Sequence, residues 1–274
     1  MNRLRSGLSF LALASLVTIA AAAPAVTLTK LDDRVRVEVG GKLFTEYVFK
    51  GASRPYCYPI LATDGTSLVR DFPMKQTAGE DTDHPHHRAL MFAHSNANQV
   101  DFWNEGTGDI ARSPKEKGRS EHVALLETTS GSVGVIRSRN RWVAPDYRLI
   151  CTDERTLRFH APKGTERIVD MEVTVFASHG DLVLGDTKEG TMAIRLAESM
   201  RLAQPAKKSG LGHILNSEGV RDGDTWGKRA AWVDYTGPVE GRTLGVAIFD
   251  HPSNPRFPTW WHVRDYGLFA ANPF

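Results

Sequence analysis

The sequence predicts an all-β protein, built as a large antiparallel β-sandwich. Alternating polar and apolar residues recur along most of the chain, turns rich in glycine and proline separate these segments, and helical periodicity is weak throughout. This combination is typical of two packed sheets. The 274 residues are 41% hydrophobic and 24% charged, a composition that supplies a sizeable core and excludes overall disorder.

The first predicted element is a hairpin. Residues 34–39 (RVRVEV) alternate charged and apolar side chains, so one face of this strand is exposed to solvent and the other is buried. Gly40 and Gly41 form the turn, and residues 42–49 continue as the second strand.

Later segments show the same alternation between short turns. They predict strands at 121–128, 132–143, 147–151, 156–160, 168–177, 230–235 and 244–249. Segment 193–202 is the best helix candidate and also fits a strand. Long polar or glycine-rich stretches predict loops, either functional or disordered, at 71–88, 103–120 and 203–227.

Residues 1–23 are predicted to be a secretory signal peptide, with an uncleaved anchor as the alternative. Two arginines precede an apolar run over residues 8–19, and residues 20–23 are alanines suited to cleavage. Residues 24–274 then form a single β-sandwich domain, exported to the periplasm or the extracellular space. Losing the two arginines takes the formal net charge from +2 to zero, which gives no indication of nucleic-acid binding. No later segment is long and apolar enough to span a membrane.

Two cysteines are too few for a disulfide scaffold or a cysteine-only zinc site. In an exported protein Cys57 and Cys151 could form one disulfide, and two separate buried thiols are the alternative. The sequence contains no GxGxxG after a strand, no GxxxxGK[ST], no GxSxG and no HExxH. These absences argue against a dinucleotide-binding domain, a P-loop, a standard α/β-hydrolase and a zincin.

The densest group of chemistry-bearing residues is Asp83-His84-Pro85-His86-His87-Arg88. Pro85 disfavours a helix here. In an extended chain His84 and His86 share one face, and His87 points to the other. Imidazoles at this density can transfer protons, bind a metal or donate to a substrate oxygen, and Arg88 can hold an oxygen-rich ligand. We predict catalytic roles for the three histidines and Arg88; a solvated polar loop with one buried histidine is the alternative.

Two further groups suit a sugar ligand. Asp101 and Trp103 place an acid beside an aromatic ring, which can stack on the C–H face of a sugar while the carboxylate binds hydroxyl groups. Of Phe102 and Trp103, one is expected in the core. Lys188 and Glu189 precede Gly190, a residue that favours a ligand-facing loop, and an ordinary charged turn is equally open.

The third group lies near the C-terminal end. His251 follows an apolar strand, where sites often form. If extended, Trp260 and Trp261 point to opposite faces, one toward the core and one toward a cleft. Glu189 and His251 complete the catalytic candidates. The substrate-binding candidates are Asp101, Trp103, Lys188, Arg195, Trp261 and His262. If a divalent metal is bound, its candidate ligands are His84, His86 and His251.

These motifs, in this order, resemble the DUF6807 family. The resemblance rests on His84-Pro-His-His-Arg88, Asp101-Phe-Trp103, Asp186-Thr-Lys-Glu-Gly190, Asp250-His-Pro252 and Ala271-Asn-Pro-Phe274. Members are often labelled "methane oxygenase PmoA", a label that does not fit a chain without transmembrane helices, and we predict no methane oxidation. Members typically are exported proteins of polysaccharide-degrading bacteria, near sugar oxidoreductases and 3-keto-sugar enzymes, so the resemblance implies a carbohydrate partner. They usually continue past Asn-Pro-Phe, which implies that this chain lacks the family's last strands.

The resemblance implies a fold like the galactose mutarotase supersandwich. By analogy with mutarotases, His84, His86 or His251 would donate to a sugar oxygen and Glu189 would act as base.

Three functions are open at this point. The first is an enzyme acting on a glycoside or 3-keto-sugar as a lyase, hydrolase or epimerase, in which Arg88 and a histidine stabilise the developing oxyanion. The second is a non-catalytic carbohydrate-binding domain with Trp103, Trp260 and Trp261 as its stacking platform. The third is an oxygenase whose metal is held by histidines and Asp101.

Overall fold

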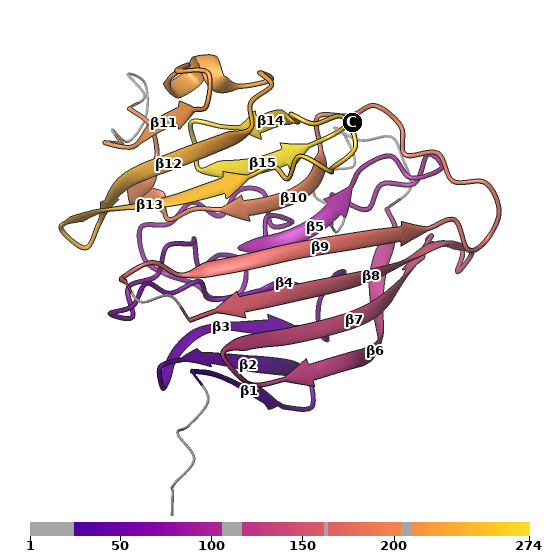
Figure 1. Cartoon of the computed structure of the whole chain (residues 1–274). Helices are drawn as coiled ribbons and strands as arrows, with labels where there is room; N and C mark the ends of the chain where they lie inside the picture. Colours follow the sequence, from indigo (N-terminus) through magenta and orange to yellow (C-terminus); the bar gives the residue numbers. More distant parts are fainter. Residues whose placement is uncertain (1–24, 106–116, 162–163, 204–209) are drawn as a thin grey trace, which may run out of the picture.

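The structure is a computed structural model that describes residues 25–105, 117–161, 164–203 and 210–274 (Figure 1). The predicted signal peptide lies outside these residues. The strands are β1 (Val26–Lys30), β2 (Arg34–Val39), β3 (Lys42–Val48), β4 (Tyr56–Cys57), β5 (Leu90–His94), β6 (Arg119–Thr129), β7 (Val133–Val143), β8 (Leu149–His160), β9 (Ile168–Phe176), β10 (Gly190–Arg195), β11 (His213–Asn216), β12 (Trp232–Val239), β13 (Arg242–Phe249), β14 (Trp260–Val263) and β15 (Leu268–Asn272). Two 3₁₀ turns, η1 (Glu198–Met200) and η2 (Asp222–Thr225), are the helical elements of the described residues. Neither is long or apolar enough to cross a membrane.

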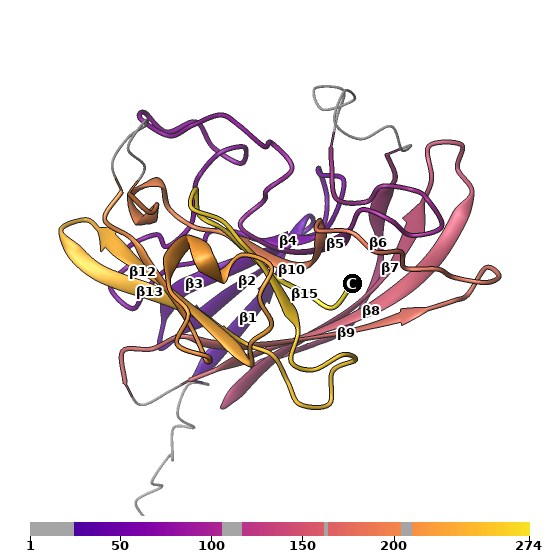
Figure 2. The ribbon, with the colours of Figure 1, turned by 90° about the horizontal axis from the view of Figure 1, so that it is seen from above.

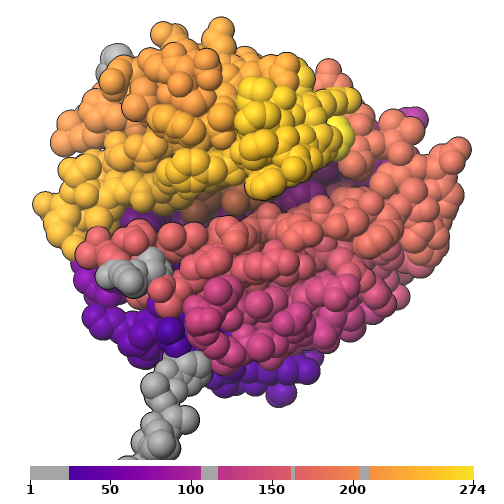
Figure 3. Space-filling model, in the orientation of Figure 1, coloured from indigo at the N-terminus to yellow at the C-terminus, as the bar shows by residue number. Residues whose placement is uncertain are grey.

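The strands form three antiparallel sheets, as the sequence predicts. The largest has eight strands in the order β1-β2-β3-β4-β5-β10-β15-β14. A four-stranded sheet has the order β6-β7-β8-β9, and a three-stranded sheet has the order β11-β12-β13. Figures 1 and 2 show the two smaller sheets side by side against the large one, the four-stranded sheet near β1–β3 and the three-stranded sheet near β10 and β15. The space-filling view shows a hollow between them (Figure 3).

One face of the eight-stranded sheet carries the main core, and both smaller sheets pack on it. Phe44 of β3 meets Phe159 of β8 edge to face, with ring centroids 5.9 Å apart. Phe269 of β15 lies 6.2 Å from Tyr235 of β12. All four rings belong to one continuous cluster of buried side chains, so the two layers share a single core.

The strand pattern of the sequence is largely confirmed. The predicted hairpin is β2–β3, with Gly40 and Gly41 in its turn at φ 59° and 72°. The predicted strands at 147–151 and 156–160 are one strand, β8, so the predicted break was wrong. The charged residues between them misled the prediction because Asp153 and Arg155 are buried together, with Arg155 Nε 2.9 Å from Asp153 Oδ1.

Other expectations need smaller corrections. The segment 193–202 continues strand β10 and then forms the 3₁₀ turn η1. The loop predicted at 203–227 contains β11 and η2. Strand β11 has only four residues, too few for an alternating pattern to stand out. Residues 71–88 form a loop as predicted, whereas residues 106–116 of the predicted loop 103–120 lie outside the described residues. Cys57 and Cys151 are free, buried thiols, and burial raises the pKa of each to about 12.

Candidate functional site

The second face of the eight-stranded sheet forms the floor of the candidate site. The pairing registers place Tyr56, Met91, Ala193, Ala270 and His262 in one row across five adjacent strands. Partners in an antiparallel pair point to the same face. The two alanines in the middle of the row are fully buried. Their small side chains leave room above the sheet for two polar loops, which cover the floor.

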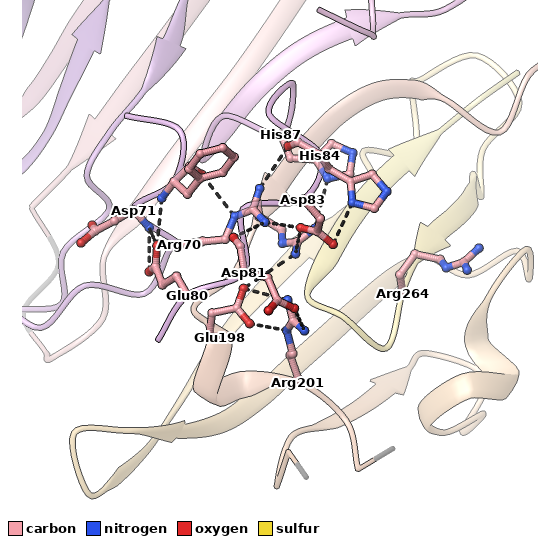
Figure 4. Close-up of polar contacts among 12 residues, drawn as sticks. Arg70, Asp71, Glu80, Asp81, Asp83, His84, His87, Glu198, Arg201 and Arg264 are labelled. Carbon is pink, nitrogen blue, oxygen red and sulfur yellow. Dashed lines mark hydrogen bonds and ion pairs between the residues drawn. The ribbon is translucent and has the colours of Figure 1, made fainter. Parts of the chain in front are cut away.

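The first of these loops, residues 70–88, is tied to the sheet through buried arginines (Figure 4). Arg70 donates to the backbone carbonyl of His84 at 3.1 Å and contacts the carboxylate of Asp83. Arg195, on β10, donates to Asp83 Oδ1 at 3.2 Å and to Nδ1 of His87 at 3.2 Å. Burial alone would raise the pKa of Asp83, but contacts with His84 and the charge of Arg195 hold it well below its usual range. Asp83 is therefore a fixed anion that positions the histidines.

A third buried arginine, Arg54, connects this loop to the second one, the described segment 95–105 that follows β5. It donates to the backbone carbonyl of His86 at 3.1 Å and to that of Trp103 at 2.6 Å. Its guanidinium lies 3.4 Å from Glu105, which also accepts two hydrogen bonds at 3.0 and 2.8 Å from Arg88. Arg88, a predicted catalytic residue, is therefore engaged by a carboxylate that holds it in place.

The three histidines of the loop form one cluster. The rings of His84 and His87 stack with centroids 4.8 Å apart, and His86 meets His87 edge to face at 4.3 Å. The ring of Tyr266 lies parallel to both, 5.1 Å from His84 and 6.4 Å from His87. The expectation that His87 points away from its neighbours was wrong. His84 has φ 45°, and the His87 N–H donates to the His84 carbonyl at 3.0 Å, so this segment is a turn and does not alternate like a strand.

Burial favours the neutral forms of His86 and His87. It lowers the pKa of His86 to about 3, with the charge of Arg54 adding to the effect, and it lowers the pKa of His87 well below its usual value. Because Nδ1 of His87 accepts from Arg195, the proton of this neutral ring resides on Nε2. That N–H is buried and has no hydrogen-bond partner among the described residues. It is a buried neutral donor whose hydrogen-bonding capacity is not used within the described residues.

Glu189 and His262 lie at the edge of this cluster. Burial raises the pKa of Glu189, against the lowering effect of Lys188, whose Nζ lies 3.6 Å from Oε1. His262 and Lys188, the neighbour of Glu189 in the chain, line the same groove, and the charge of His84 lowers the pKa of both Glu189 and His262. Burial and then the charge of Arg264 lower the pKa of His262 to about 3. A carboxyl group of raised pKa therefore lies close to neutral imidazoles, an arrangement suited to acid–base catalysis.

An open groove of about 550 Å³ adjoins the cluster. His262, at the edge of the cluster, lines this groove together with Lys188. The groove is lined by Asp186, Thr187, Lys188, Trp226, Gly227, Arg256, Trp260, Trp261, His262, Asn272 and Phe274. The Trp226 side chain is 46% exposed, so one of its surfaces is available to a ligand. Aromatic rings beside charged groups are typical of sites that bind polar rings such as sugars.

Some predicted residues have structural roles. Asp101 is fully buried and accepts hydrogen bonds from the backbone N–H groups of Trp103 and Asn104 at 2.8 and 3.1 Å. Phe102 and Trp103 are both buried, so the expectation of one core residue between them was wrong. Trp261 faces the core as expected of one of the tandem tryptophans, and its indole N–H donates to the Ala230 carbonyl at 2.8 Å.

The predicted metal ligands are not brought together. His84 and His86 lie in the cluster, whereas His251 is exposed in the turn after β13, where its Nδ1 accepts from the Ser253 N–H at 3.1 Å. Within the described ranges no three His, Cys, Asp or Glu side chains are placed to hold a metal ion. No hydrogen bond, ion pair or ring contact joins His251 to Glu189 or to the histidine loop among the described residues, and its catalytic role stays a prediction.

Tyr266 is a site residue that sequence reasoning missed. It follows β14 as a single aromatic residue in a turn, and composition cannot distinguish such a residue from an ordinary core aromatic. Only the β14–β15 register brings it beside the histidine loop, which lies far away in the sequence. Burial raises its pKa to about 12, against the charge of Arg195, whose Cζ lies 4.7 Å from the ring centroid. Tyr266 is therefore a neutral ring that supports His84.

Comparison with known proteins supports the family resemblance of the sequence motifs. Residues 34–274 match the model of a family described as "Family of unknown function (DUF6807)". None of the curated proteins and none of the solved structures compared matches the chain. The family resemblance seen in the motifs is confirmed, and the likeness to mutarotases stays a prediction.

Proposed function

The chain belongs to DUF6807, a family of unknown function, and from that premise we propose that it is an exported carbohydrate-active enzyme acting on a glycoside or 3-keto-sugar by acid–base chemistry. The observation that supports this most directly is the pairing of Glu189, whose pKa is raised by burial, with a cluster of buried neutral imidazoles. A general base works best when its pKa lies close to the working pH, and burial moves a glutamate in that direction.

Each group has a defined part in the proposed reaction. Glu189 takes a proton from a carbon next to the sugar carbonyl or from a sugar hydroxyl. The neutral N–H of His87 donates a hydrogen bond to the oxygen on which negative charge develops. His84 is about one quarter exposed and is the member of the cluster best placed to exchange protons with solvent. Arg195 and Asp83 act on the ligand only through the histidines that they position.

The experiment is incubation of the purified protein with a panel of 3-keto-glycosides and glycosides, with products followed by chromatography. Turnover that is lost in Glu189→Gln and kept in Glu218→Gln, a surface control, supports the proposal. Running each reaction with and without a chelator separates chemistry by these side chains from chemistry that needs a metal. Absence of turnover over a broad panel would contradict the enzyme proposal.

The groove favours a second candidate, a non-catalytic carbohydrate-binding domain. Its exposed Trp226 ring would bind sugars without any change to them. This alternative predicts sugar binding that survives His84→Ala and His86→Ala, since imidazoles then serve only as polar lining. Three buried imidazoles are more than binding alone requires, which is why catalysis is the preferred proposal.

A further inference from the structure

Arg264 differs from the other arginines around the histidine cluster. Each of those others is neutralised by at least one carboxylate: Arg54 and Arg88 by Glu105, Arg70 by Asp83, Arg195 by Asp83 and Glu198, and Arg201 by Asp81 and Glu198. The guanidinium of Arg264 has no carboxylate partner among the residues that the structure describes. Figure 4 shows it extending apart from the charge network of Arg70, Asp83 and Arg201.

The surroundings of Arg264 hold it in place. Its Cζ lies 5.5 Å from the ring centroid of Tyr266 and 5.9 Å from that of Trp226. Its backbone N–H donates to the Leu268 carbonyl at 2.7 Å, and its carbonyl accepts from Gly267 N–H at 3.1 Å. A planar cation between two rings on a fixed backbone is preorganised, so little conformational entropy is lost when it binds a ligand.

The location of Arg264 connects the two parts of the site. Tyr266 stacks on His84 in the imidazole cluster, and Trp226 lines the groove. Lys188 and Arg256 place positive charges on the groove wall, and Glu189 partly neutralises Lys188 at 3.6 Å. Arg264 therefore lies between a ring of the groove and a ring of the imidazole cluster, with no carboxylate partner among the described residues.

We propose that the ligand of this site is an acidic sugar, whose carboxylate pairs with the guanidinium of Arg264 while its ring lies against Trp226. A guanidinium binds a carboxylate through two parallel hydrogen bonds, and the indole face accepts the C–H face of the sugar ring. The inference rests on the proposed carbohydrate function and narrows its substrate class from sugars in general to uronic acids and glycosides that contain them.

The test is equilibrium binding measured by titration calorimetry on the full chain. The probes are D-glucuronate and D-galacturonate, their neutral counterparts D-glucose and D-galactose, and acetate and inorganic phosphate as anions without a sugar ring. We expect the uronates to bind more tightly than the neutral sugars and than either simple anion. Arg264→Gln should weaken uronate binding roughly tenfold to a hundredfold, the loss typical of a charge-assisted hydrogen-bonded pair, and weaken neutral-sugar binding by clearly less.

Two further variants complete the test. Arg148→Gln removes an exposed arginine from the β7–β8 turn and should leave all binding unchanged. Arg264→Lys keeps the charge without the planar fork and should retain part of the uronate preference; it replaces Arg264→Gln if that variant does not fold. The inference is overturned if uronates fail to bind, bind no better than neutral sugars or acetate, or keep their affinity in Arg264→Gln.

The outcome is separable from that of the proposed function. Uronate binding through Arg264 without turnover would retain this inference and contradict the enzyme proposal. Turnover of neutral glycosides that depends on Glu189, with no preference for acidic ones, would retain the enzyme proposal and overturn this inference.

Discussion

Single side chains of this site owe their chemistry to burial more than to residue type. Glu189 and His262 are ordinary titrating residues in water, yet burial raises the pKa of one and lowers that of the other. Both shifts favour the neutral forms. Fixed charges on Asp83, Arg70 and Arg195 hold the neighbouring histidines His84 and His87 in position.

Replacing Glu189 tests the central catalytic assignment. Glu189→Gln keeps the size of the side chain and removes the proton acceptor, so we expect turnover to fall by about 100-fold or more, the usual contribution of a general base. The melting temperature should be unchanged or higher, because the burial that raises the pKa of this carboxyl group also penalises its charged form. Steady-state kinetics and thermal denaturation measure both. A large fall in melting temperature would instead assign Glu189 a structural role.

The pH dependence of the reaction gives an independent check on Glu189. A base must be ionised to act, so activity should rise with pH as Glu189 loses its proton. Since burial moves the pKa of this group above its ordinary value of 4.5, the acidic limb of the kcat/KM profile should lie above that pH. An acidic limb at or below 4.5 would contradict the assignment.

The buried histidines also make stability depend on pH. The pKa of His86 and that of His262 are each about 3 in the folded protein and near 6.5 in the unfolded chain. Between these values the unfolded state binds more protons, so stability is lost as pH falls from about 6.5 toward 3. Each imidazole contributes a slope of up to about 1.4 kcal/mol per pH unit. Urea unfolding at several pH values measures this slope. His262→Asn should reduce the slope, and His213→Gln, at an exposed position, should leave it unchanged.

At the scale of strands and loops, the sequence predicts what depends on local alternation. The β2–β3 hairpin follows from an alternating pattern and two glycines, and most other strands follow similarly. The site was predictable only as a collection of residues. The density of histidines at 84–87 indicated function, but their arrangement depends on the positive φ of His84 and on bonds to Arg70 and Arg195, which come from elsewhere in the fold.

The floor of the site depends on small residues in β10 and β15. Ala193→Leu inserts a branched side chain beneath Trp103 in the cluster that also contains Met91 and Ala270. Overpacking of this kind typically costs about 1–3 kcal/mol, and here it should also displace the histidine loop and reduce ligand binding. Chemical denaturation and binding titrations measure the two effects. Ala247→Leu, on the exposed face of β13, is the matched control and should change neither.

At the scale of the whole molecule, the two faces of the eight-stranded sheet have different structural roles. One face carries a continuous core that includes residues from all three sheets, and the other supports the polar site. Because the site has no large apolar core of its own, its geometry depends on the sheet beneath it. The arrangement of the smaller sheets therefore controls the site indirectly, through the positions of β5, β10, β14 and β15.

A shared core predicts that both smaller sheets unfold together with the large one. Ile136 of β7 and Ile214 of β11 are each 1% exposed and lie in the two smaller sheets, within the same apolar cluster. Replacing either by alanine should cost about 2–5 kcal/mol. Because the core is continuous, each variant should lower the melting temperature of one cooperative transition, observed at the same temperature by calorimetry and by tryptophan fluorescence. The opposite outcome is two separate transitions, one shifted by Ile136→Ala and the other by Ile214→Ala. It would show that the smaller sheets unfold independently and that the site could lose its support on one side alone.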